Sequence, residues 1–174
     1  VLTTYSLWTN NILVGSADFL QVGENTYNSL EAAINAIEEE GTIIQLSNGA
    51  INAETSIPEG KNITLDTQGY ELTMIKTVTN NGTFTLTNSA STKSKISSGV
   101  SINLFVNNGI MNVSNVDISG YNIINSGTES EVNLQSVIFN ATNQAIINTG
   151  ELTIEESEIF GNSYAIYDNT TTAS

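Results

Sequence analysis

The sequence of 174 residues contains no cysteine, no histidine and no arginine, and it has a single proline. Without cysteine, the chain can form no disulfide framework and carry out no thiol chemistry. Without histidine, it lacks the commonest general base and the commonest ligand of transition metals. No apolar stretch approaches the length of a membrane span. These absences disfavour many enzyme classes and predict no membrane insertion.

Positive charge is also scarce. Eighteen acidic residues stand against four lysines, and the formal net charge is −14 at pH 7. Such a chain cannot neutralise a run of phosphates, so nucleic acid is disfavoured as a partner, and an anionic membrane would repel it. The sequence begins with Val1 and shows no signal peptide. We expect an extracellular or cell-surface protein, as a fragment of a longer or processed chain.

One short phrase recurs along the chain. It reads Asn-Gly-Thr-Phe-Thr-Leu-Thr-Asn at residues 81–88, and related copies occupy residues 108–115, 128–135 and 149–156. Each copy has a turn residue followed by two apolar side chains two positions apart. A period of two is typical of a β-strand that buries one face.

The spacing between units is nearly constant. The second apolar residue of each unit falls at Leu46, Leu65, Leu86, Val113, Leu134 and Ile154, in steps of 19, 21, 27, 21 and 20 residues. A step near twenty residues that contains several short strands indicates a stack of coils. The one long step predicts a loop around residues 89–94, where the side chains are small and polar.

Two further ladders share this spacing. One aligns residues 105–109, 123–127, 146–150 and 166–169, and the other consists of Ile118, Phe139 and Ile159. The asparagines at the coil turns also align, and they are Asn80, Asn107, Asn125 and Asn148. Three ladders indicate three strands per coil, and neighbouring coils must stack because a single unit cannot bury its own apolar face. The sequence therefore predicts an all-β fold, a right-handed parallel β-helix of about six coils. We expect the asparagines to form a structural ladder of stacked amides.

The first residues lack the repeat. Residues 1–27 are rich in β-forming side chains and include the only tryptophan, Trp8. We expect two or three short strands there, which either cap the stack or act as a donor strand for a neighbouring molecule. Coils are expected over residues 42–168 and a tail or linker over 169–174, all within one structural domain.

Residues 28–41 predict a capping helix. Asn28 is the expected first cap residue, with Glu31 completing the cap, and Gly41 is the expected stop. One face of the helix is apolar and consists of Leu30, Ala33, Ile34 and Ile37. We expect that face to cover the open end of the first coil.

Several stretches resemble one family. They are Tyr27–Ile34, Gly41–Leu46 and Ile57–Asp66, followed by residues 150–154 and 159–167. Together they resemble the pectate-lyase-like repeat domains of bacterial and archaeal surface proteins, and the later coils look like adhesin-like repeats. The resemblance implies a β-helix over about residues 27–167. It implies no single activity, because such domains include lyases, hydrolases, adhesins and scaffolds.

The enzymes of this fold set a test for catalysis. The resemblance implies that a lyase would need calcium-binding aspartates and an arginine, and this chain has no arginine. A hydrolase would need clustered aspartates as acid and base. The aspartates here lie in separate coils or flanks, and the lysines near predicted turns or the polar loop; they are Asp18, Asp66, Asp117 and Asp168, and Lys61, Lys76, Lys93 and Lys95. Only Asp66 and Asp117 are candidates to approach by stacking. We expect no catalytic residues and no enzymatic activity.

Two glutamates are the one candidate metal site. Glu131 and Glu151 align on adjacent coils, as do Gln135 and Glu155. Stacked carboxylates repel each other unless solvent screens them or a cation bridges them. The pair therefore indicates either a solvated surface or a weak Ca²⁺ site, and no other cofactor is expected.

Three threonines suggest a further surface function. Thr83, Thr85 and Thr87 alternate as they would on an ice-binding face. We expect no threonine column to continue on the other coils, which disfavours that function.

Three functional hypotheses remain. The first is a non-enzymatic structural or adhesive module of an extracellular surface protein, with a host glycan or protein as its ligand. The second is a self-assembling extracellular filament subunit, joined end to end through the N-terminal β segment. The third is a degenerate polysaccharide lyase or hydrolase.

Overall fold

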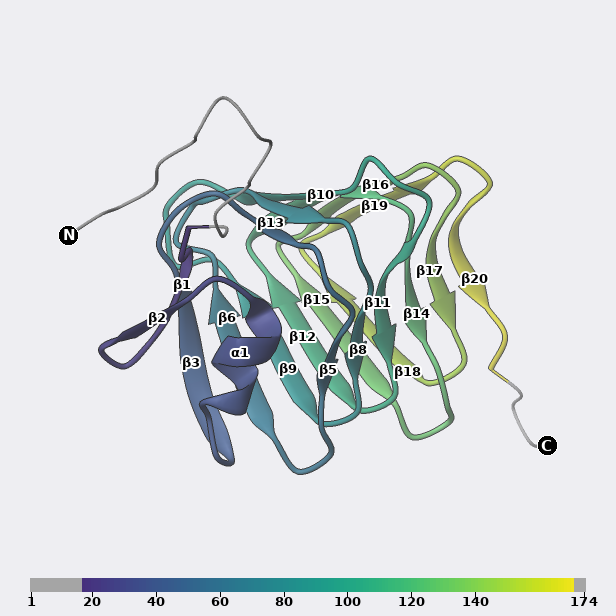
Figure 1. The fold of residues 1–174 in the computed structure, drawn as a ribbon. Coiled ribbons are helices and arrows are strands. Elements are labelled where there is room, and N and C mark those ends of the chain that lie inside the picture. Colours follow the sequence, from purple (N-terminus) through teal and green to yellow (C-terminus); the bar gives the residue numbers. More distant parts are fainter. Residues whose placement is uncertain (1–16, 171–174) are drawn as a thin grey trace, which may run out of the picture.

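The chain folds as a parallel β-helix. The computed structural model describes residues 17–170, in which six coils of three strands each stack along one axis (Figure 1). Residues 1–16 and 171–174 lie outside the described part, and with them Trp8, most of the expected N-terminal strands and the end of the expected tail.

Each coil contributes one strand to each of three sheets, so all pairs of coil strands are parallel. Sheet 1 contains β3 (Glu40–Gln45), β6 (Asn62–Asp66), β9 (Thr83–Thr87), β12 (Ile110–Ser114), β15 (Glu131–Gln135) and β18 (Glu151–Glu155). Sheet 2 contains β4 (Gly49–Ile51), β7 (Leu72–Met74), β10 (Ser94–Ser97), β13 (Val116–Gly120), β16 (Ile138–Ala141) and β19 (Glu158–Gly161). Sheet 3 contains β5 (Thr55–Ile57), β8 (Val78–Asn80), β11 (Asn103–Asn107), β14 (Asn122–Asn125), β17 (Gln144–Asn148) and β20 (Tyr164–Asp168).

The expected apolar ladders are confirmed, with one correction. In sheet 1, Leu65, Leu86, Val113, Leu134 and Ile154 are in register, and in sheet 2, Ile118, Phe139 and Ile159 are in register. The prediction for Leu46 was wrong, because Ile43 pairs with Leu65 and is fully buried, whereas Leu46 follows the strand and is 38% exposed. The sequence permits two alternating pairs, Ile43 with Gln45 or Ile44 with Leu46. The strand buries the first pair, so the polar side chain of Gln45 faces the core.

The asparagine ladder is confirmed at the corner after sheet 3. The amide Nδ2 of Asn80 donates to Oδ1 of Asn107 at 2.7 Å, and Asn107 donates to Asn125 at 2.9 Å. Asn125 donates in turn to Asn148 at 2.8 Å. All four side chains are buried, so each amide satisfies its neighbour where water cannot.

The glycine of the repeat phrase follows this ladder and sits where successive coils approach closely. A Cβ atom added to Gly109 would lie 2.1 Å from the carbonyl oxygen of Gly82, and one added to Gly82 would lie 2.4 Å from that of Lys61. Gly150 meets Ser130 in the same way, at 2.2 Å. The phrase therefore needs glycine for lack of space.

The long step between Leu86 and Val113 produces the expected loop. Residues 88–93 connect β9 to β10, whereas Asn115 alone connects β12 to β13 on the next coil. The next coil holds the loop in place, since Nδ2 of Asn115 donates to the carbonyl oxygens of Asn88 and Ala90, each at 2.9 Å. A second insertion, residues 98–102, precedes β11.

One end of the stack is covered. The hairpin of β1 (Leu20–Val22) and β2 (Asn25–Tyr27) adds to sheet 1 by antiparallel pairing of β1 with β3. Helix α1 (Leu30–Asn35) lies across the first coil, beside β1, β2 and β5 (Figure 1). The expected cap residues Leu30, Ala33, Ile34 and Ile37 are all buried.

The helix is shorter than the sequence predicted. Its cap is Ser29, whose side chain accepts from the Ala32 amide, and not Asn28. It ends at Asn35 with Ala36 as the C-cap, so the prediction that Gly41 stops it was wrong; Gly41 belongs to β3. No helix among residues 17–170 is long and apolar enough to cross a membrane.

Candidate functional site: the outer face of sheet 1

The outer face of sheet 1, which we call the polar face, carries the most regular arrangement of surface side chains. Because strand residues alternate, each strand of sheet 1 presents every second side chain outward. The strand registers place these side chains in columns that run along the axis. The middle column consists of Thr42, Thr64, Thr85, Asn112, Asn133 and Thr153.

This column corrects an expectation from the sequence. We expected no threonine column beyond Thr83, Thr85 and Thr87, yet threonine occupies four of the six middle positions and asparagine the other two. The pattern was visible in the sequence, because each of these residues from Thr64 to Thr153 lies between the two apolar residues of its unit. The threonines of one strand, Thr83, Thr85 and Thr87, do not reveal the column, because it runs across the strands and includes asparagine.

Hydrogen bonds fix the middle of the polar face. Nδ2 of Asn112 donates to Oγ1 of Thr85 at 3.3 Å, and Nδ2 of Asn133 donates to Oδ1 of Asn112 at 3.1 Å. In the neighbouring column, the hydroxyl oxygens of Thr87 and Ser114 lie 2.8 Å apart. These bonds hold several side chains of the polar face in place.

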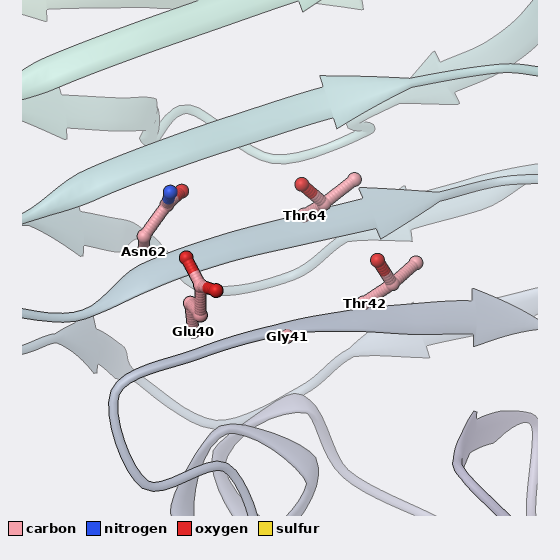
Figure 2. Close-up of a pocket in the computed structure, with 5 residues that line it drawn as sticks. All are labelled: Glu40, Gly41, Thr42, Asn62 and Thr64. Carbon is pink, nitrogen blue, oxygen red and sulfur yellow. The ribbon is translucent and has the colours of Figure 1, made fainter.

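The first two coils form a shallow depression on this face. Its volume is about 260 Å³, and it is lined by Glu40, Gly41, Thr42, Asn62 and Thr64. Figure 2 shows Thr42 and Thr64 projecting side by side from β3 and β6, with Asn62 next to Glu40. Position 41 faces inward, since a Cβ atom added to Gly41 would lie 3.1 Å from the side chain of Ile37, so the outward side chains that border the depression on β3 are Glu40 and Thr42.

Charge lies at the sides of the polar face and not in its middle column. Glu40, Glu131 and Glu151 belong to one flanking column, and Asp66 and Glu155 to the other. The carboxylate of Asp66 accepts hydrogen bonds from the backbone N–H groups of Ser89 and Gln68. Burial raises the pKa of Asp66, but these bonds and those of the Ser89 and Gln68 side chains together outweigh it and lower the pKa below its ordinary value.

The expected glutamate pair is adjacent. Glu131 is in register with Glu151, and Gln135 with Glu155. Oε1 of Glu131 already accepts from Nδ2 of Asn133 at 2.7 Å. Within the described residues, no group of three or more acidic side chains is placed to hold a metal ion. A Ca²⁺ ion would therefore need backbone carbonyls or water to complete its shell, and the site stays a prediction.

The four aspartates are not brought together. Asp66 lies on sheet 1 and Asp117 on sheet 2, two coils away, in register with Lys95 and Ile138. Asp18 accepts from the hydroxyl of Thr26 beside the terminal hairpin. Asp168 ends the asparagine ladder, where the Thr170 backbone N–H and then the Asn148 amide lower the pKa of its carboxyl.

Two of the lysines hold the fold together. Nζ of Lys61 donates to the carbonyl oxygens of Ile34, at 3.0 Å, and of Ile37. Nζ of Lys93 donates to the carbonyl oxygen of Ser136, a corner residue with a φ of 53°. Both ammonium groups thus donate hydrogen bonds to backbone carbonyl oxygens. The two lysines lie near turns or in the polar loop, as the sequence predicted.

Comparisons with known proteins add no relative: no family model, curated protein or solved structure matches the chain. The class that the fold defines is therefore the parallel β-helix alone, and the resemblance to pectate-lyase-like and adhesin-like domains rests on the sequence stretches that carry it.

Proposed function

We propose that this chain is a non-enzymatic binding module of an extracellular surface protein, in which a rigid β-helix presents the polar face to a neutral polysaccharide. The observation that carries the proposal is the middle column, six hydrogen-bonding side chains without a charge in a chain of net charge −14. The resemblance to surface adhesin-like repeats favours the same setting.

The geometry suits a long hydroxylated polymer. Side chains on neighbouring coils are about 4.8 Å apart, and those two residues apart on one strand are about 6.7 Å apart. Hydroxyl and amide groups on such a lattice can donate and accept along the whole face. Threonine and asparagine are short, and hydrogen bonds already restrain Thr85, Asn112 and Asn133, so little conformational entropy is lost on binding.

The flanking charges favour a neutral polymer over an acidic one. Glu40, Asp66, Glu131, Glu151 and Glu155 border the middle column. These carboxylates would repel a polyuronate at neutral pH, and the repulsion would fall only at high salt. A neutral glycan meets no such barrier.

A binding test separates the polar face from the rest of the surface. We would measure how much of the purified chain insoluble cellulose, chitin and β-glucan remove from solution. For soluble polygalacturonate, we would measure the retardation of the chain in a gel that contains the polymer. At least one neutral polymer should bind, and polygalacturonate should not. Thr85→Arg, which places a long charged side chain at the centre of the face, should weaken binding at least about tenfold.

Thr73→Arg is the matched control. Thr73 is also a half-buried threonine at the outward position of a strand, but it lies on β7 of sheet 2. Binding that survives Thr85→Arg, or that both variants weaken equally, would contradict the assignment to the polar face. Preference for polygalacturonate would contradict the neutral ligand.

A further inference from the structure

The last coil exposes apolar side chains to an unusual extent. Among the described residues, nine large apolar side chains are exposed, and four of them lie within residues 160–167. They are Phe160, Tyr164, Ile166 and Tyr167, with exposures of 52, 58, 39 and 45%. The rings of Tyr164 and Tyr167 lie next to each other, 6.1 Å between centroids. Exposed apolar groups gathered in one place mark an interaction surface.

The interior of this coil is uncovered as well. Ile146 on the fifth coil is fully buried, whereas its register partner Ile166 is 39% exposed. Leu134 is buried, and its partner Ile154 is only partly buried. β18, β19 and β20 each have a neighbour on one side only, so three strand edges with free backbone groups surround these side chains.

The opposite end differs in each of these respects. There the hairpin covers β3, and α1 covers the first coil with Leu30, Ala33 and Ile34, which are buried. Figure 1 shows β1, β2 and α1 at one end of the stack and β18, β19 and β20 at the other. The molecule thus has one closed end and one open end.

The charge around the open end restricts what can cover it. Residues 150–170 contain five acidic side chains and no lysine: Glu151, Glu155, Glu156, Glu158 and Asp168. Two copies joined through their open ends would bring ten carboxylates together, which is repulsive at neutral pH. The end of the asparagine ladder also restricts the occupant. The carboxylate of Asp168 has no N–H to donate to a further layer, so it can only accept hydrogen bonds. The occupant should be uncharged, β-forming and able to donate hydrogen bonds.

We propose that residues 1–16 of a second copy bind the open end by adding strands to the edges of β18, β19 and β20. This segment contains no charged residue, and half of its sixteen residues are apolar or aromatic. One coil takes 20 residues from Glu131 to its register partner Glu151, so the segment is about the length of a coil. Asn10 and Asn11 supply amide donors at its centre. Such strand addition satisfies edge groups and covers apolar side chains together.

The position of the segment favours a second copy over the same chain. The described chain begins at Ala17, beside Ser47 and Gly49 of the first coil, and so at the closed end. Reaching its own last coil means crossing six coils, roughly 29 Å, which uses about nine extended residues. Head-to-tail contact instead brings the whole segment to the neighbour's last coil. Because unlike ends meet, the contact propagates into a filament. This inference does not depend on the polar face.

Cross-linking tests the contact directly, because the chain has no cysteine of its own. We would prepare the full chain as Leu7→Cys and as Ile166→Cys, mix the two and add a short bismaleimide. A covalent heterodimer is expected. Ile75→Cys is the matched control, because Ile75 is equally exposed at 40% but lies on the second coil; with Leu7→Cys it should give at least tenfold less heterodimer.

The single tryptophan provides an independent signal. Trp8 lies in the proposed segment, so its emission should shift to shorter wavelength as the protein concentration rises, and Ile166→Lys should abolish the shift while Ile75→Lys keeps it. Equal cross-linking of Ile75→Cys and Ile166→Cys, or none, would overturn the proposal. So would a chain carrying both Leu7→Cys and Ile166→Cys that links only within itself, since the segment would then cover its own coil.

Discussion

The ammonium group of Lys61 donates a hydrogen bond to the carbonyl oxygen of Ile34 at 3.0 Å, at the end of α1. The same group also donates to the carbonyl oxygen of Ile37. A helix end leaves carbonyls without partners inside the helix, and a cation there also offsets the helix dipole. Lys61 precedes β6, so the second coil fastens the helix that covers the first.

Replacing Lys61 by methionine should therefore loosen the closed end. Lys61→Met keeps an unbranched side chain of similar length but removes both hydrogen bonds, and we expect a loss of about 1 kcal/mol in the free energy of unfolding. Urea unfolding measures it. Lys76→Met, at an exposed turn residue, is the control and should change stability by less than about 0.5 kcal/mol. Equal losses in the two variants would contradict the capping role.

The close approach of the coils at Gly109 gives a second prediction. Gly109→Ala places a Cβ atom 2.1 Å from the carbonyl oxygen of Gly82, so the coils must move apart, at a cost of about 3 kcal/mol. Gly99→Ala is the control, because nothing lies within 4 Å of its Cβ position. Thermal unfolding compares the two. An unchanged melting temperature for Gly109→Ala would contradict the close approach of the coils at this corner.

The buried amide ladder gives a third prediction. Asn107→Ala removes the acceptor of Asn80 and the donor to Asn125, and it leaves the carbonyls of Gly109 and Glu131 without that amide. We expect a loss of about 3 kcal/mol, because buried polar groups lose their partners. Asn108→Ala, its exposed neighbour, should cost less than about 1 kcal/mol. Chemical denaturation measures the free energy of unfolding of both variants, and equal losses would contradict the role of the ladder.

Asp66 gives a prediction about pH. Its pKa in the folded chain is below the ordinary value of 3.8, so its carboxylate stabilises the fold above that pH. The contribution should disappear as the pH falls below 3.8 through the folded pKa. Asp66→Asn should therefore reduce the pH dependence of the unfolding free energy between about pH 2 and pH 4. Asp117→Asn, which retains Asp66, should keep that dependence; a full slope in Asp66→Asn would contradict the role of Ser89 and Gln68.

The repeat made the coils predictable from sequence. Apolar pairs such as Phe84 and Leu86 fix which face of a strand is buried, and the register follows once the units are aligned. Asn107 and Asn125 were predictable for the same reason. Where the repeat is weak, the pattern permits two registers. The observed one buries Ile43 together with Gln45, which goes against the usual burial of apolar residues, and so the sequence predicted Leu46 wrongly.

The polar face and the ends depended on information that the pattern does not carry. The threonine column appears only when the residue between the apolar pair is compared from coil to coil. The cap at Ser29 is a local hydrogen bond from the Ala32 amide, which the pattern does not distinguish from a cap at Asn28, whereas the carbonyls at the end of α1 are bound by Lys61, which lies 24 residues beyond Ile37. The exposure of Ile166 depends on the absence of a seventh layer within the described residues.

The central claim is that the stack is closed at one end and open at the other, and amide hydrogen exchange in dilute solution tests it most directly. The last residues of β3, Ile44 and Gln45, pair with β1, and β3 also pairs with β6, whereas β18 pairs on one side only. Amides of Ile44 and Gln45 should therefore be protected like those of β12, and those of β18, β19 and β20 should exchange at least about tenfold faster. Protection of β18, β19 and β20 equal to that of Ile44 and Gln45 in the dilute monomer would contradict the open end.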